Sequence, residues 1–138
     1  MFPVRRYLNK SAMALLAAAT VLGSVPAHAD DGFPFGFEMT LDTAPQPGSK
    51  RLPTLEIGDN GEATLELWCK NVKGQFSVAG NTVVFVAGAM QDRACSPAQT
   101  EADDTLLAAL GAATNWTRRG DFVTFTGSTT LRFHLNTN

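Results

Sequence analysis

The sequence predicts an α+β fold: a mainly antiparallel, curved β-sheet packed against one α-helix at about residues 96–111. Two observations lead to this prediction. Several short segments alternate apolar and polar residues, which is the period of a half-buried strand. These segments lie on both sides of a single stretch that carries the signals of a helix start. Because short turn sequences separate them, neighbouring strands are expected to pair as antiparallel hairpins.

The first 29 residues have the pattern of a cleaved signal peptide. Arg5, Arg6 and Lys10 precede an uncharged apolar run at 11–25, and the tripeptide AHA at 27–29 provides the small residues of a cleavage site. The apolar run has about 15 residues, whereas a membrane-spanning helix needs roughly 20. We therefore expect cleavage after Ala29, no transmembrane segment and a location in the periplasm or outside the cell. No cysteine lies near the cleavage site, so a lipoprotein is not expected.

The charge of the mature chain disfavours two classes of partner. Residues 1–29 hold three of the 11 Lys and Arg and none of the 13 Asp and Glu, so their removal leaves a net charge of about −5. Neither nucleic acid nor anionic lipid attracts such a chain. The remaining length suits one small domain. The expected partner is an envelope protein or a small ligand, and the sequence does not indicate the oligomeric state.

The chain has two cysteines, Cys69 and Cys95. An oxidising compartment favours a disulfide between them, which would stabilise the fold by about 3 kcal/mol on the loop-entropy model. The alternative is a pair of free, buried core cysteines. A structural zinc site would need His134 as a further ligand, and the spacing does not support one, so no metal site is predicted.

Residues 30–50 are rich in Pro, Gly and aromatic residues. We expect an extended lead-in to the domain at 51–138, with at most one edge strand. Its Phe33, Phe35 and Phe37 form a possible binding surface. The alternative is that these rings simply cover the core.

The next segments predict strands. Leu55 and Ile57 end one strand, and a second alternates from residue 62 to Cys69, which places Cys69 on the buried face and Trp68 on the outward face. Gly80-Asn81 predicts a two-residue hairpin turn. The strand after it is apolar on both faces at residues 83–86, which indicates a central strand.

A helix is expected from Ser96. Ser96 fits the N-cap, Pro97 the first helical position and Gln99 the capping box. Asp103 and Asp104 are expected on a solvated face. Cys95 lies just before the helix, where a thiolate would be reactive, although a disulfide is the expected use. After the helix, alternation at 122–126 and 130–135 predicts two half-buried antiparallel strands.

The sequence offers no catalytic constellation. His134 is the one histidine after the cleavage site, and no nucleophile elbow or glycine-rich phosphate loop is present. The adjacent Asp103 and Asp104 diverge by about 100° on a helix and cannot share a site. We predict no catalytic residues and no cofactor.

Residues 52–138 resemble the META domain, or HslJ-like (heat-shock protein HslJ), family. The resemblance rests on the order of short motifs: Cys69 and Asn71, Gly74 and Phe76, Gly80-Asn81, Met90, Ala94-Cys95, the leucine-rich helix with Leu106, Leu107 and Leu110, Gly120-Asp121, and Leu131 with Phe133. It implies an envelope protein linked with stress, in some members with heat induction and novobiocin tolerance, and without an established enzyme activity.

Two functions follow as expectations. The first is an exported, non-catalytic envelope protein that supports envelope integrity or stress and antibiotic tolerance through binding. The alternative is a periplasmic lysozyme inhibitor, because those proteins are also small, exported, β-rich and cysteine-paired. The expected binding surface comprises Phe33, Phe35, Phe37 and the outward Trp68.

Overall fold

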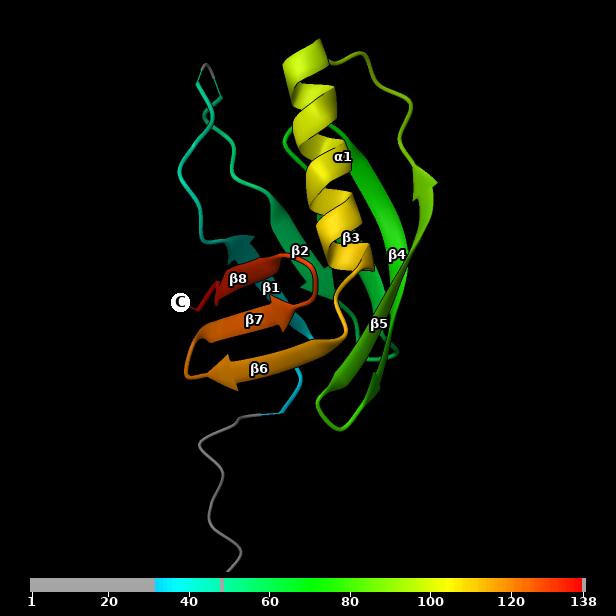
Figure 1. The fold of residues 1–138 in the computed structure, drawn as a ribbon, viewed down its shortest axis with the longest axis vertical. Coiled ribbons are helices and arrows are strands. Elements are labelled where there is room, and N and C mark those ends of the chain that lie inside the picture. The colour runs from blue at the N-terminus through cyan, green and yellow to red at the C-terminus, as the bar shows by residue number, and fades with distance from the viewer. Residues whose placement is uncertain (1–31, 48, 138) are drawn as a thin grey trace, which may run out of the picture.

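The computed structural model describes residues 32–47 and 49–137, so the predicted signal peptide lies outside the described residues. Eight strands and one helix are described (Figure 1). In chain order they are β1 (Phe37–Leu41), β2 (Thr54–Ile57), β3 (Glu62–Glu66), β4 (Asn71–Ala79), β5 (Thr82–Met90), α1 (Pro97–Gly111), β6 (Asn115–Arg119), β7 (Phe122–Thr126) and β8 (Thr130–Leu135).

The strands form a closed antiparallel barrel. Each strand pairs with the next one in the chain, and β1 pairs also with β8, so that the order is β1 to β8 around the barrel. Met39 of β1 lies opposite Leu55 of β2 on one side and Leu135 of β8 on the other. The predicted fold class is therefore wrong in its architecture: the sheet is not an open curved layer packed on a helix, because its first and last strands join.

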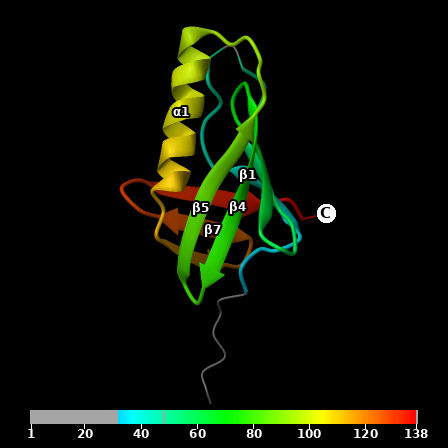
Figure 2. The same ribbon diagram turned by 90° about the vertical axis from the view of Figure 1, so that its right-hand side faces the viewer.

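The helix lies where the barrel is least complete. Between β5 and β6 the register is a single pair, Thr82 opposite Asn115, and α1 is the connection between these two strands. Figure 1 shows α1 upright along the long β4–β5 hairpin, with β6, β7 and β8 crossing below it. Figure 2 shows β5 between α1 and β4. The helix thus covers an opening that strand pairing leaves beyond Thr82.

One apolar core fills the barrel. Alternate residues of the strands point inward, as expected for a small barrel whose interior is filled by side chains, although in β5 only Val83 and Phe85 are buried. Phe76 and Phe125 stack with their ring centroids 5.6 Å apart, and Phe133 meets the edge of Phe125. The largest fully buried side chains are Phe125, Phe133, Met39, Leu55, Ile57, Leu65, Leu67, Leu110, Leu135, Val72, Val83 and Val123.

Strand β5 is not central. Val83 and Phe85 are buried, but Val84 and Val86 remain 51% and 61% exposed. A barrel buries only its inner face, so apolar residues on both faces of a strand do not require layers on both sides. The prediction of a central strand at residues 83–86 is wrong for this reason.

The segment at 30–50 contributes a fully paired strand. β1 lies inside this segment and has neighbours on both edges, β2 and β8. The expectation of an edge strand there is wrong, because β8 returns from the far end of the chain to close the barrel beside β1.

The helix start is confirmed. Ser96 is the N-cap, its hydroxyl accepts a hydrogen bond from Gln99 N–H (3.2 Å), and the Gln99 side chain accepts one from Ser96 N–H (3.1 Å). Pro97 occupies the first helical position. This capping box satisfies backbone donors that a helix N-terminus otherwise leaves unpaired.

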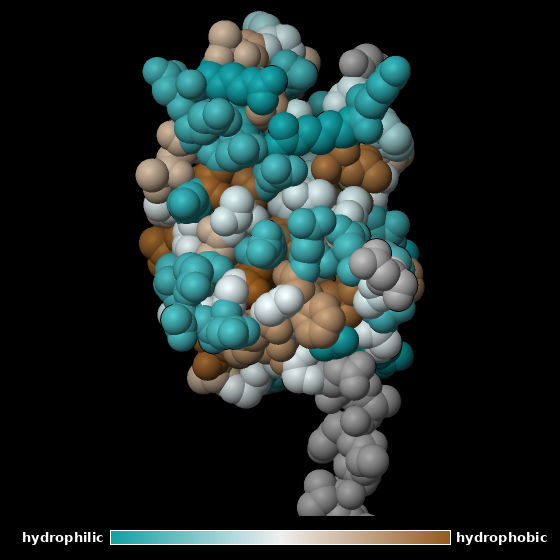
Figure 3. All heavy atoms as spheres, turned by 180° about the vertical axis from the view of Figure 1, so that it is seen from behind, coloured by the Kyte–Doolittle hydropathy of each residue, from teal (hydrophilic) through white to brown (hydrophobic). Residues whose placement is uncertain are grey.

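The face of the molecule that points away from the viewer in Figure 1 is mostly polar. Figure 3 shows hydrophilic side chains over much of this face, with hydrophobic residues in small separate patches. None of the described helices has the length and apolar character needed to cross a membrane.

Gly61 and Gly120 provide a test of the packing around the β2–β3 turn. Both have positive φ, but a Cβ at Gly61 would lie 2.4 Å from the Phe76 carbonyl oxygen, whereas a Cβ at Gly120 would have nothing within 4 Å. Gly120→Ala should cost about 1 kcal/mol from backbone strain alone. Gly61→Ala should lower the free energy of unfolding by at least about 1 kcal/mol more, because of the added clash. Urea denaturation measures both, and equal losses would contradict this packing.

Candidate functional site

A disulfide joins Cys69 to Cys95, as predicted. Cys69 lies in the turn between β3 and β4, and Cys95 immediately precedes the N-cap of α1. The bridge therefore attaches the start of the helix to this one turn of the barrel. Neither cysteine is a free thiol in the structure.

The turn at residues 67–70 is buried beneath the helix. Strand β3 ends at Glu66, and Leu67 N–H donates to the Lys70 carbonyl (2.8 Å). Trp68 is 8% exposed, and Cys69 is buried beside it. The expectation that Trp68 points outward is wrong, because the alternation of a strand no longer applies once the chain turns after Glu66.

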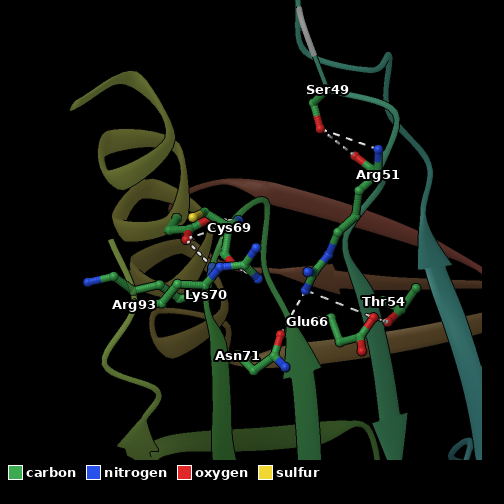
Figure 4. A network of polar contacts seen from close by, with 9 residues as sticks. Ser49, Arg51, Thr54, Glu66, Cys69, Lys70, Asn71 and Arg93 are labelled. Atoms are coloured by element: carbon green, nitrogen blue, oxygen red, sulfur yellow. Dashed lines mark hydrogen bonds and ion pairs between the residues drawn. The ribbon is translucent and has the colours of Figure 1, made fainter. Parts of the chain in front are cut away.

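Asp103 connects α1 to the same turn. Its carboxylate accepts hydrogen bonds from Cys69 N–H (3.1 Å, Oδ1) and from Lys70 N–H (2.9 Å, Oδ2), and the side chain is 1% exposed. Figure 4 shows Cys69 and Lys70 beside the helix. Asp104 is exposed, as predicted. The expectation of a solvated Asp103 is wrong, because the turn covers that side of the helix.

A polar network extends from the turn across β2, β3 and β4 (Figure 4). The Arg51 guanidinium donates from Nη2 to Asn71 Oδ1 (2.7 Å) and lies 3.9 Å from Glu66 Oε2. Arg93 donates to the Cys69 carbonyl (3.3 Å). Asn71, singled out by its motif, thus holds Arg51 in place. Sequence reasoning missed Arg51, because no local pattern links residues 51 and 71.

A groove of about 450 Å³ lies between α1, the segment after β1 and the start of β8. Trp68 contributes to its lining from the buried turn. The other lining residues are Leu41, Thr43, Gln46, Ala98, Glu101, Ala102, Thr105, Leu106, Ala109, Thr129 and Leu131. The volume lies in the range of small-molecule sites.

The two tryptophans differ in their hydrogen bonding. Trp116 Nε1–H donates to the Gly80 carbonyl (2.9 Å). Trp68 Nε1–H has no hydrogen-bond partner among the described residues. Among the described residues, one side-chain nitrogen or oxygen is both unpaired and buried from solvent, and it is Arg51 Nε. Trp68, which lines the groove, therefore has an unpaired indole N–H that is accessible to solvent.

The aromatic lead-in lies at a different place. Phe33 is half-buried and packs on Trp116, with ring centroids 5.1 Å apart, and on Phe76, at 5.7 Å. Phe35 and Phe37 are exposed, and the Arg118 guanidinium lies over the Phe37 ring. No ring contact within the described residues joins Trp68 to this cluster. The four aromatics of the predicted surface do not form one cluster, and its binding role stays a prediction.

The polar face of β8 holds His134. Its ring is exposed and meets the edge of the Phe122 ring at 5.0 Å. Over the ranges 32–47 and 49–137, no group of three or more His, Cys, Asp or Glu side chains is arranged to hold a metal ion.

Comparisons with known proteins concern the family and the fold. The family model for the META domain matches residues 38–137. A solved structure, an NMR structure of a protein, is similar with a TM-score of 0.55 at 16% sequence identity, covering 72% of this chain and 89% of that chain. That likeness concerns the fold alone. No curated protein sequence matches this chain.

Asp103 and Asp104 form a matched pair for a stability test. In Asp103→Asn the amide retains one acceptor oxygen but turns an NH₂ group toward the backbone donors of the turn. It should therefore lower the free energy of unfolding by about 2 kcal/mol. Asp104→Asn should change it by less than about 0.5 kcal/mol, because that side chain is exposed. Thermal or urea denaturation measures the difference, and indistinguishable variants would contradict a stabilising role for Asp103.

Proposed function

This chain belongs to the META domain family, and from that premise we propose that it is an exported, non-catalytic binding protein of the bacterial cell envelope. Its role is to support envelope integrity under stress or antibiotic exposure. It does so by binding an envelope component in the groove beside Trp68.

The groove is the observation that carries this proposal. It places apolar side chains and unpaired hydrogen-bonding groups on one concave surface, the usual composition of a site that binds a ligand. The helix that forms one wall is fixed to the barrel by the disulfide and by Asp103. A wall that is held in position needs little reordering on binding, which favours affinity.

Two features support export. Residues 1–29 have the pattern of a signal peptide, and Cys69 is paired with Cys95. Disulfides form and persist mainly in oxidising compartments such as the periplasm. The stress-related role rests on the HslJ-like resemblance of residues 52–138.

A photo-crosslinking experiment tests the proposal. A photoreactive amino acid replaces Thr43 at the groove or, as a control, Thr117 on the outer face of β6, where the side chain is also exposed. The full chain is expressed in a bacterial host and irradiated during heat or novobiocin stress. The probe at Thr43 should give a discrete envelope adduct that the probe at Thr117 does not, on a chain whose N-terminus begins at Asp30.

Equal labelling from Thr43 and Thr117 would overturn the groove as the binding surface. If the chain is found in the cytoplasm with residues 1–29 still attached, the proposal that it is exported is wrong. An adduct with lysozyme from the Thr43 probe would replace the proposal with the alternative, a lysozyme inhibitor.

A further inference from the structure

We propose that the groove beside Trp68 binds an uncharged saccharide, such as a glycan strand of the envelope; this inference rests on the proposed function and names its ligand class. The structure supports it through the charge, the hydrogen-bonding groups and the shape of the groove walls.

The charge of the lining favours a neutral ligand. Glu101 is the one charged residue that lines the groove, and it is exposed to solvent. No lysine or arginine lines it. A phosphate or carboxylate would therefore find no cation to offset the loss of its hydration. The groove does not suit an anionic ligand.

The polar groups of the groove are available for hydrogen bonds. The Thr43, Thr105 and Thr129 hydroxyls and the Gln46 amide form no side-chain hydrogen bond within the described residues, and the same holds for Trp68 Nε1–H. Each hydroxyl or amide group can both donate and accept. A saccharide, which presents hydroxyl groups that also do both, complements this set.

The apolar part of the lining fits the same ligand. Leu131 and Ala102 are half-buried in the groove, and Leu41 is buried beside them. A pyranose ring has C–H groups that gain from leaving water against such a surface, while its hydroxyls reach the polar groups around it. Binding would thus remove apolar surface from water, and the hydroxyls of the saccharide and the polar groups of the groove would still form hydrogen bonds.

The walls of the groove do not suit an extended peptide. One wall is α1, whose backbone groups beyond its first turn are paired within the helix, and the opposite wall is the irregular segment after β1. The strand at its base, β8, is paired with β7 from Thr130 to His134, whereas its pairing with β1 covers only Phe133–Leu135. Beyond these, Asp42 N–H donates to the Arg132 carbonyl (2.8 Å). Adding a strand to a free edge is one common way to bind an extended peptide, and among the described walls only the short stretch of β8 at Thr130 and Leu131 lacks a strand on its β1 side.

The chain has two tryptophans, so the two indole N–H signals in a ¹H–¹⁵N spectrum provide the test. The oxidised mature protein is titrated with N,N′-diacetylchitobiose and with cellobiose as probes. At least one disaccharide should shift the Trp68 signal in a saturable way and leave the Trp116 signal, whose N–H is bonded to Gly80, in place. Thr105→Val should weaken this binding about fivefold. Thr100→Val, on a helix position outside the groove, should leave the affinity unchanged.

Three outcomes would overturn the inference. The first is that neither disaccharide shifts the Trp68 signal. The second is that Thr100→Val and Thr105→Val weaken binding equally. The third is that an uncharged peptide shifts the Trp68 signal whereas the disaccharides do not. This last result would contradict the saccharide as the ligand but would leave the groove as a binding site. In contrast, absence of an adduct from the Thr43 probe in the cross-linking experiment would contradict the proposed binding function itself.

Discussion

The carboxylate of Asp103 holds the helix to the turn between β3 and β4, and the groove depends on this contact. A carboxylate at 1% exposure is costly to bury unless its oxygens accept hydrogen bonds, and here two backbone N–H groups supply them. The same turn is bonded covalently to the residue before the helix through Cys69 and Cys95. Together the two connections fix both the start and the middle of α1 against the barrel.

This attachment explains the position of Trp68. The turn beneath the helix holds the indole so that it lines the groove while most of its surface stays buried. Arg93, which donates to the Cys69 carbonyl, and Arg51, which donates to Asn71, support the turn from either side. A polar network of this kind favours one geometry, because its carboxylate, amide and guanidinium groups hold backbone and side-chain partners on several elements, with Arg51 Nε the one buried side-chain nitrogen or oxygen left unpaired among the described residues. The groove is therefore a fixed feature of the fold.

The closed barrel and the helix are linked by the same geometry. Strands β5 and β6 meet only at Thr82 and Asn115, and the helix between them in sequence covers the opening. Because β1 pairs with β8, the segment that follows β1 passes close to the helix and forms the second wall of the groove. The groove thus combines residues from both ends of the domain.

Local features of the fold could be predicted from the sequence. The capping box at Ser96 and the Gly80-Asn81 turn depend on neighbouring residues, and a chain with two cysteines has one possible internal pairing. Closure of the barrel could not be predicted from the sequence. Alternation indicates which face of a strand each residue occupies, but it does not indicate which strands pair. The sequence does not place Asp103, because its burial comes from a contact between residues more than thirty positions apart. A sequence pattern over one helical turn cannot indicate the contact between Asp103 and Cys69. The sequence does not place Trp68, because the chain leaves the strand after Glu66 and the alternation no longer applies.

Amide hydrogen exchange at Cys69 and Lys70 tests most directly whether Asp103 holds the turn to the helix. If it does, both amides should exchange only through global unfolding, with a protection free energy equal to that of unfolding, whereas the amide of Asn60, in an exposed turn, should exchange rapidly. Exchange of Cys69 and Lys70 as fast as that of Asn60 would show that the turn opens independently of the barrel and would contradict this account.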